Sequence, residues 1–181
     1  MPFNSRSKVY ILGYAGIVLA TVVGSIGLGA PGWFIASPQT GVEAFAGLWQ
    51  FCLRGQGEFD CTYIDYTSFD NYQKATQAMA CIGVALLIAS TLYGLYVNAV
   101  STNSPSSPYV EILALLGGVC LFIGCMVWVG YKYKLNPDPP DTEVSLGYAM
   151  IMATIGSVLA IQASVCVAVG SRRNGSYQQI Q

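Results

Sequence analysis

Four stretches of this 181-residue chain contain no Asp, Glu, Lys or Arg, and each is long enough to cross a lipid bilayer. A hydrocarbon core about 30 Å thick needs roughly 20 helical residues. Only 9% of the residues are charged, against about 25% in a soluble domain. We therefore predict a membrane α-helical protein, a single tetraspan domain over residues 1–181. The predicted helices cover residues 9–30, 75–97, 112–131 and 146–170.

The basic residues near the two ends of the chain predict its orientation. An even number of spans places both termini on one side, and Lys and Arg concentrate in cytoplasmic segments. Arg6 and Lys8 precede the first span, and Arg172 and Arg173 follow the fourth. We expect a multi-pass plasma-membrane protein with cytoplasmic termini. The other segments are then extracellular loop one at 32–74, a cytoplasmic loop at 98–109, extracellular loop two at 132–145 and a cytoplasmic tail at 171–181.

The two predicted extracellular loops are acidic. Loop one carries five acidic and two basic residues, a net charge of −3, and loop two adds −1. The cytoplasmic segments carry +3, so the total of −1 conceals an acidic outer face. Such a face favours cations within a Debye length of about 8 Å at physiological salt.

Two of the six cysteines, Cys52 and Cys61, lie in predicted extracellular loop one. Because disulfides persist on the oxidising outer side of a cell, we expect these two to pair. The closed ring of ten residues would stabilise the loop by roughly 2–3 kcal/mol. Aromatic and β-branched runs separated by turn residues predict a small antiparallel sheet in this loop. The predicted strands cover residues 34–35, 47–53 and 59–64, with a hairpin connection at 54–60.

Three acidic residues, Asp60, Asp65 and Asp70, lie around the second cysteine and the strand that contains it. They form either a solvated face of the loop or a charged lining that sorts ions or docks a partner. Cys166 lies near the cytoplasmic end of the fourth span, where the thiol is either palmitoylated or unmodified. We expect the cysteines inside the spans to be small packing residues: Cys81, Cys120 and Cys125.

Small residues recur every four residues along the fourth span, at Gly156, Ala160, Ser164 and Ala168. In lipid, helices associate through close approach of their backbones, so such a ridge marks a helix contact. That contact lies either inside the four-helix bundle or between molecules.

Aromatic side chains lie near the predicted membrane interfaces, where amphipathic rings settle. We expect them to form an aromatic belt. Its members would be Tyr10, Tyr14, Trp33, Tyr93, Tyr96, Tyr109, Trp128, Tyr131 and Tyr148.

The residue types argue against an enzyme. The chain has no histidine, which excludes His-based proton transfer, catalytic triads and the common metal sites. No carboxylate lies within a predicted span, so intramembrane aspartyl chemistry and proton relays lack their groups. We expect no enzyme activity, no cofactor, no metal and no nucleic-acid partner, and a lipid bilayer as the surroundings.

The tryptophans and cysteines of loop one follow a recognisable order: Trp33, Gly47-Leu48-Trp49, Cys52 and Cys61. This order resembles the W, G-L-W, C, C signature of the claudin superfamily. That tetraspan group also includes the epithelial membrane proteins, the peripheral myelin proteins and the calcium-channel gamma subunits. Further similar features are Pro31, Gly117-Gly118 followed by Phe122, Asn136-Pro137 and Leu146-Gly147.

The resemblance implies a left-handed four-helix bundle that carries a small extracellular sheet. It also implies that Trp49 anchors the sheet near the membrane and that Cys52 and Cys61 bridge neighbouring strands. In claudins these sheets meet side by side and across cells, and they seal or conduct through the paracellular space.

The chain departs from the claudin pattern in four places. Gln77 stands where many claudins carry Arg, so a salt bridge from that position is lost. The spacing from Trp33 to Trp49 is shorter than usual, and Tyr133-Lys134-Leu135 replaces an aromatic pair. The polar last residue, Gln181, does not suit a PDZ groove built for a hydrophobic C-terminus. We therefore regard the chain as a divergent member and do not expect PDZ binding.

Three functions are compatible with these features. The first is a cell-junction structural protein that associates with itself and forms a paracellular barrier or a cation-favouring pore, with Asp65 and Asp70 influencing ion passage. The alternative is an auxiliary subunit that clasps an ion channel or receptor through the third and fourth spans. A membrane organiser of the growth-arrest or myelin type is a third reading.

Overall fold

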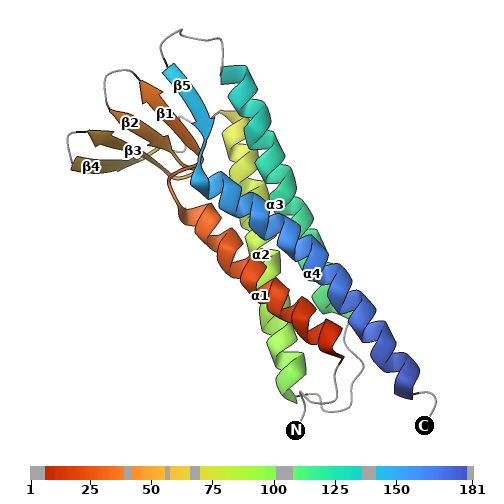
Figure 1. The fold of residues 1–181 in the computed structure, drawn as a ribbon. Coiled ribbons are helices and arrows are strands. Elements are labelled where there is room, and N and C mark those ends of the chain that lie inside the picture. Colours follow the sequence, from red (N-terminus) through yellow and green to blue (C-terminus); the bar gives the residue numbers. More distant parts are fainter. Residues whose placement is uncertain are drawn as a thin grey trace.

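The computed structural model describes residues 7–38, 42–55, 58–65, 70–100, 108–135 and 142–178. These residues form four long helices with a five-stranded sheet at one end of the bundle (Figure 1). Helix α1 begins and helix α4 ends at the opposite end of the bundle (Figure 1). The helices are α1 (Lys8–Gly29), α2 (Asn71–Val100), α3 (Pro108–Leu135) and α4 (Tyr148–Gln178). The predicted fold class, a membrane four-helix bundle with a small antiparallel sheet, is confirmed.

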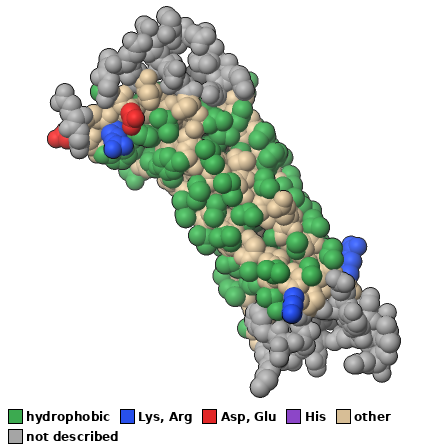
Figure 2. Space-filling view, in the orientation of Figure 1, with side chains coloured by type: hydrophobic (Ala, Val, Ile, Leu, Met, Phe, Trp, Pro, Cys, Tyr) green, Lys and Arg blue, Asp and Glu red, His purple; other side chains and the backbone are tan. Residues whose placement is uncertain are grey.

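Each of the four helices is long and apolar enough to cross a bilayer. The apolar spans run over Lys8–Gly29, Asn71–Ala99, Pro108–Gly130 and Tyr148–Arg172. Hydrophobic side chains cover the visible face of the bundle, while the described charged side chains lie near its two ends (Figure 2). The chain is therefore a multi-pass membrane protein.

Helices α1 and α4 pack at close range because small residues face each other along both. A Cβ added at Gly27 of α1 would lie 2.6 Å from the backbone nitrogen of Ala153, and one at Gly156 of α4 would lie 2.9 Å from that of Gly24. Such close backbone approach is how helices associate in lipid. The sequence indicated a small-residue ridge on α4, but the small residues of α1 that pack against α4 were not predicted. These recur at Gly13, Gly16, Ala20, Gly24 and Gly27.

The ridge predicted on α4 lies mostly inside the bundle. Gly156, Ala160 and Ser164 are buried, and Ala168 is half-buried. Gly156 packs against α1, whereas Ala160 packs against Gly118 of α3. Of the two placements considered, the intramolecular contact accounts for these residues.

The sheet is antiparallel throughout, with the strand order β4-β3-β2-β1-β5. Its strands are β1 (Phe34–Pro38), β2 (Glu43–Ala46), β3 (Gln50–Gly55), β4 (Glu58–Tyr63) and β5 (Thr142–Leu146). β2 and β5 were not predicted, and the strand expected at 47–53 begins only at Gln50. The β3–β4 connection is shorter than the predicted 54–60, since Gly55 already pairs with Glu58.

The pairing of β1 with β5 follows from the packing of α1 on α4. Strand β1 begins five residues after α1 ends, and β5 ends two residues before α4 begins. Because the two helices lie together, the segments that continue from them also lie together, and Phe34 pairs with Leu146. Strand β5 was not predicted because its partner, β1, is more than 100 residues away in the sequence.

Several tyrosines and tryptophans expected in an aromatic belt lie inside the protein instead. Tyr10, Tyr14, Trp33 and Trp128 are between 0% and 7% exposed. The hydroxyl of Tyr14 donates a 2.7 Å hydrogen bond to the carbonyl oxygen of Thr91 on α2. The belt prediction was wrong for these four, because their rings fill space inside the protein instead of facing the membrane interface. Tyr96, Tyr109 and Tyr148 are exposed.

Candidate functional site: a disulfide-stapled sheet and its attachment to the bundle

Two tryptophans hold the sheet to the last turn of α1. The indole nitrogen of Trp33 donates to the carbonyl oxygen of Gly27 at 2.8 Å, and that of Trp49 donates to Leu28 at 2.9 Å. The last four carbonyl groups of a helix lack partners within the helix, so these bonds satisfy groups that would otherwise need water. The signature tryptophans therefore act as caps for α1 as well as anchors for the sheet.

The Gly47-Leu48-Trp49 segment turns the chain between β2 and β3. Leu48 is fully buried, and its carbonyl oxygen accepts a hydrogen bond from the side-chain amide of Gln77 on α2. A Cβ added at Gly47 would lie 2.7 Å from the Cα of Pro31, which explains why glycine occupies this position. In the sequence, Gln77 indicated only that a salt bridge is lost. In the structure, its uncharged amide links α2 to the sheet through this hydrogen bond.

A second close approach joins β5 and α4 to β1. The Gly147 amide donates to the carbonyl oxygen of Trp33 at 2.9 Å, and the Ala149 amide donates to that of Gly32 at 2.8 Å. A side chain at Gly147 would collide with the Gly32 carbonyl group. The β1–β5 ladder therefore continues to the first turn of α4, and the Leu146-Gly147 similarity noted in the sequence gains a physical reason.

Aromatic rings fill the corner between the sheet and α3. Trp128 of α3 stacks on Phe34 with ring centroids 4.9 Å apart and meets Trp33 edge-on at 5.5 Å. Such pairs contribute about 0.5–1.5 kcal/mol each beyond the area they bury. No local signal in the sequence distinguishes Trp128 from an interfacial tryptophan.

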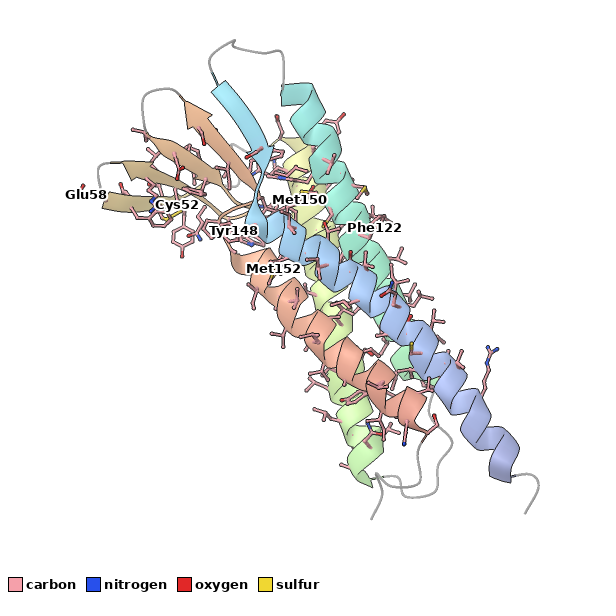
Figure 3. All side chains as sticks on the ribbon, viewed as in Figure 1. Cys52, Glu58, Phe122, Tyr148, Met150 and Met152 are labelled. Carbon is pink, nitrogen blue, oxygen red and sulfur yellow. A yellow bond between two sulfur atoms is a disulfide. The ribbon has the colours of Figure 1, made fainter. Side chains whose placement is uncertain are left out.

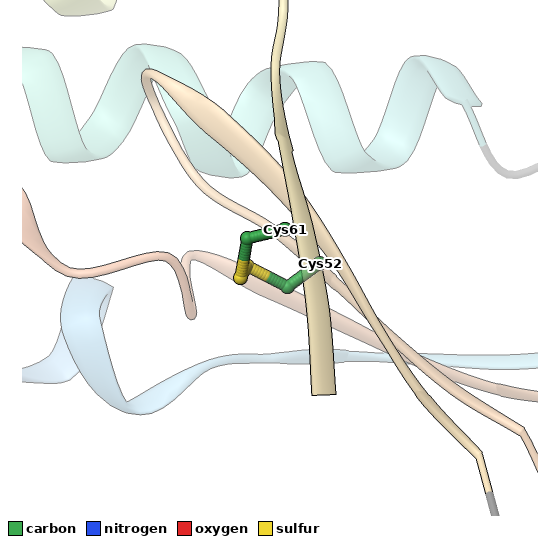
Figure 4. The surroundings of a disulfide bond; sticks show 2 residues. All are labelled: Cys52 and Cys61. Atoms are coloured by element: carbon green, nitrogen blue, oxygen red, sulfur yellow. A yellow bond between two sulfur atoms is a disulfide. The ribbon is translucent and has the colours of Figure 1, made fainter. Parts of the chain in front are cut away.

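The predicted disulfide joins Cys52 of β3 to Cys61 of β4 (Figure 4). The two residues stand directly opposite each other in the strand register, with Cα atoms 4.1 Å apart. Cys52 is fully buried, whereas Cys61 is exposed. The bond ties the edge strand β4 to its single neighbouring strand.

The strand register sorts the side chains of the hairpin onto two faces. Cys52, Cys61, Arg54 and Phe59 share one face, which we call the disulfide face. Glu43 and Arg54 form an exposed 3.9 Å ion pair on it, and Phe45 and Phe59 lie with ring centroids 6.0 Å apart. Leu53, Asp60, Phe51 and Thr62 point to the other face, where Phe34 packs on α3.

The three acidic residues predicted as a lining are all exposed. Asp60 lies within β4, Asp65 lies just beyond this strand, and Asp70 lies just before α2. Within the described part of the chain, no group of acidic or cysteine side chains is arranged to hold a metal ion. Glu58 lies at the far tip of the hairpin, whereas Tyr148 lies at the junction with the helices (Figure 3).

Cys166 is exposed on α4, where a lipid chain could reach its thiol, and its palmitoylation stays a prediction. Cys125 is buried, and Cys81 and Cys120 are half-buried, in the helices. Asn136-Pro137 and Gln181 lie outside the described residues, and Tyr133-Lys134-Leu135 form the end of α3.

The W, G-L-W junction, in which Trp33 and Leu48 are buried, and the paired cysteines together form the architecture expected of one family of tetraspan proteins. The sequence matches the PMP-22/EMP/MP20/Claudin family over residues 8–166. The chain belongs to this family. A search of curated proteins found no significant match. As a member of the PMP-22/EMP/MP20/Claudin family, which is a family of non-enzymatic membrane proteins, it carries its signature at the junction between sheet and bundle.

Proposed function

We propose that this claudin-family protein is a cell-junction structural protein. Its sheet makes lateral contacts with copies in the same membrane and trans contacts with the opposing cell, building a paracellular barrier or a cation-favouring pore. The β3–β4 hairpin is the observation that carries the proposal, because it is rigidly stapled yet projects from the bundle (Figure 1).

The hairpin exposes large apolar side chains that a protein partner would cover. Phe59 and Tyr63, on the disulfide face, are 58% and 81% exposed, and Leu53, on the opposite face, is 44% exposed. Exposed apolar surface with a polar rim is typical of interaction sites. β4 is also an edge strand of the sheet, so one side of its backbone is available to another chain.

The acidic side chains beside this surface support a preference for cations. Glu58 and Asp60 are exposed on β4, and Asp65 follows it. A fixed negative field near a narrow space raises the local concentration of cations and lowers that of anions.

The small-residue ridge of α4 does not separate the junction function from the auxiliary-subunit alternative. It would suit either function as a seat for a partner helix, but three of its four residues are buried within the protein. We favour the junction function because of the exposed hairpin.

Freeze-fracture of fibroblasts that lack junction strands tests the proposal. Cells expressing the protein should show continuous strands at cell contacts, whereas a Phe59→Ser, Tyr63→Ser double variant should reach the surface without forming them. Strand-free contacts with correctly delivered wild type would overturn the junction function. Stoichiometric co-purification of a channel subunit would instead support the alternative.

The ion preference has a separate test in a transfected epithelial monolayer. Replacing Asp65 and Asp70 together by Asn should lower the cation-to-anion permeability ratio measured from dilution potentials. An unchanged ratio at equal surface expression would mean that these carboxylates are only solvated.

The proposed orientation, with both termini cytoplasmic, predicts that Asn174 stays unmodified. Asn174-Gly175-Ser176 is the single glycosylation sequon of the chain. A glycosidase-sensitive mobility shift of the wild-type protein would place the C-terminal end of α4 outside the cell.

A further inference from the structure

One polar side chain interrupts the lipid-facing surface of the bundle. Away from the helix ends, the other exposed side chains of the four described helices belong to Ala, Val, Ile, Leu, Met or Cys. Gln162 of α4 is the exception, because it is exposed and yet carries an amide. The other membrane-embedded glutamine, Gln77, is buried and bonded to Leu48.

Gln162 lies deep in the hydrocarbon layer. It is ten residues before Arg172 and fourteen after Tyr148, the two ends of the apolar span. At a helical rise of 1.5 Å per residue, these ends are about 15 Å and 21 Å away. A glutamine side chain is too short to reach either interface, unlike the long Lys and Arg side chains that snorkel.

The amide of Gln162 has no hydrogen-bond partner among the described residues. Lipid tails cannot supply one, and an unbonded amide in an apolar medium is unfavourable. In membranes, Gln side chains instead hydrogen-bond across helix–helix interfaces. The position of Gln162 therefore points to a helix outside this chain.

The residues around Gln162 form a seam that fits such a helix. Exposed side chains recur at alternating spacings of four and three residues, at Ile151, Ile155, Val158, Gln162, Val165 and Val169. This is the heptad spacing of two helices that coil around each other, with Ile155, Gln162 and Val169 at a positions. The exposed faces of the other helices have similar spacing, which also suits lipid, so it is Gln162 that singles out α4.

We propose that a second copy of this chain covers the α4 seam, with the two α4 helices parallel and the two Gln162 amides hydrogen-bonded to each other. Copies in one membrane share one orientation, so a twofold axis along the membrane normal makes their α4 helices parallel. An amide carries both donor and acceptor groups and is therefore complementary to itself. One polar residue at an a position fixes the register of the paired helices.

The inference concerns the lateral contacts of the proposed function. It rests on that function in one respect, because it requires copies of the protein to meet within one membrane. It adds a contact within the bilayer to the lateral contacts that the sheet makes. The α4 contact needs neither an opposing cell nor the hairpin, so its test can succeed or fail independently of strand formation.

Energy transfer between labelled copies in the membranes of single, non-contacting cells tests the dimer. Full-length wild type should associate, and Gln162→Leu should lower the association constant by about tenfold, the loss expected for two interhelical hydrogen bonds. Gln162→Asn should retain more association than Gln162→Leu, because a shorter amide remains. Leu19→Ala, on the exposed face of α1, is the matched control and should associate as wild type.

Cysteine crosslinking tests the register. In a Cys166→Ser background, Val158→Cys and Val165→Cys should each give a crosslinked dimer with a mild oxidant, whereas Leu19→Cys should not. The inference would be overturned if the wild type is monomeric or if Gln162→Leu associates as strongly as the wild type. It would also be overturned if a co-purifying channel helix displaces the second copy. Association without junction strands would sink the junction function and leave the α4 dimer standing.

Discussion

The two halves of the sheet are held in different ways. The half formed by β5, β1 and β2 is joined to the helices, because the indole of Trp33 bonds to Gly27 of α1 and packs on Trp128 of α3, and the amide of Ala149 in α4 bonds to Gly32. The β3–β4 hairpin reaches beyond the bundle, and all six residues of β4 are exposed. It is held by its ladder to β2, by the ion pair and by the disulfide.

This difference teaches where covalent reinforcement is needed. A strand with buried neighbours gains stability from packing, whereas a two-stranded hairpin alone is marginally stable in water. The disulfide lies between the outermost pair of strands, where packing contributes least. The same hairpin is the surface we propose for adhesion, so rigidity is supplied without burying the surface that a partner must reach.

Removing the Trp33 ring should have the largest effect, since it is the centre of the attached half. Trp33→Ala deletes the bond to Gly27 and the contact with Trp128, and we expect a loss of about 3–5 kcal/mol in the free energy of unfolding in micelles. The control Tyr63→Ala, at an 81% exposed ring of the hairpin, should change this free energy by no more than about 0.5 kcal/mol. Equal losses would remove the distinction between the halves.

Breaking the disulfide should come next and should act locally. Cys52→Ser should lower stability by about 2–3 kcal/mol. Amide hydrogen exchange should accelerate in β3 and β4 while β1 stays protected, and surface delivery should fall. Cys120→Ser, on α3, controls for the substitution itself. Unchanged exchange and normal surface levels would show that the hairpin needs no staple.

Removing the amide of Gln77 tests the attachment between the two halves of the sheet, because Leu48 lies in the turn that connects β2 to β3. Gln77→Leu leaves the buried carbonyl oxygen of Leu48 without its donor, which should lower the free energy of unfolding by about 1–3 kcal/mol. Gln77→Arg keeps a donor at this position and should lose less. If both variants unfold as wild type does, the bond to Leu48 contributes nothing to the attachment.

The ion pair of the hairpin should have the smallest effect. Both side chains are well exposed, and such pairs contribute about 0.2–1 kcal/mol. Glu43→Gln should therefore shift the unfolding free energy within this range, and the shift should shrink at high salt. A loss as large as that of Cys52→Ser would mean that charge, not the disulfide, holds the hairpin.

Sequence reasoning succeeded where the signal is local. Hydropathy along a single segment identifies a span whatever its neighbours are, so all four helices were predicted. Cys52 and Cys61 were predicted to pair because they alone share one predicted loop on the oxidising side. The turn at Gly47 was missed, and the strand was begun too early, because a buried Leu48 next to a tryptophan also suits a strand.

The remaining features depend on contacts between distant segments. Strand β5 exists because α1 and α4 bring it beside β1, and Trp128 is buried because Phe34 and Trp33 reach it from the sheet. The residues next to β5 in the sequence do not indicate that it pairs with β1. Likewise, the residues next to Trp128 do not indicate that Trp33 and Phe34 pack against it.

The sequence by itself determined the four spans, the cysteine pair and the family signature, because each depends on composition or order within one segment. The tertiary structure alone decided which side of each helix faces lipid and which faces protein. Gln77 and Gln162 are the same residue type and both lie within apolar spans, yet one ties the sheet to the bundle and the other faces outward. The physical reason is that the surroundings of a side chain are set by the packing angle of its helix against its neighbours, which no single segment encodes.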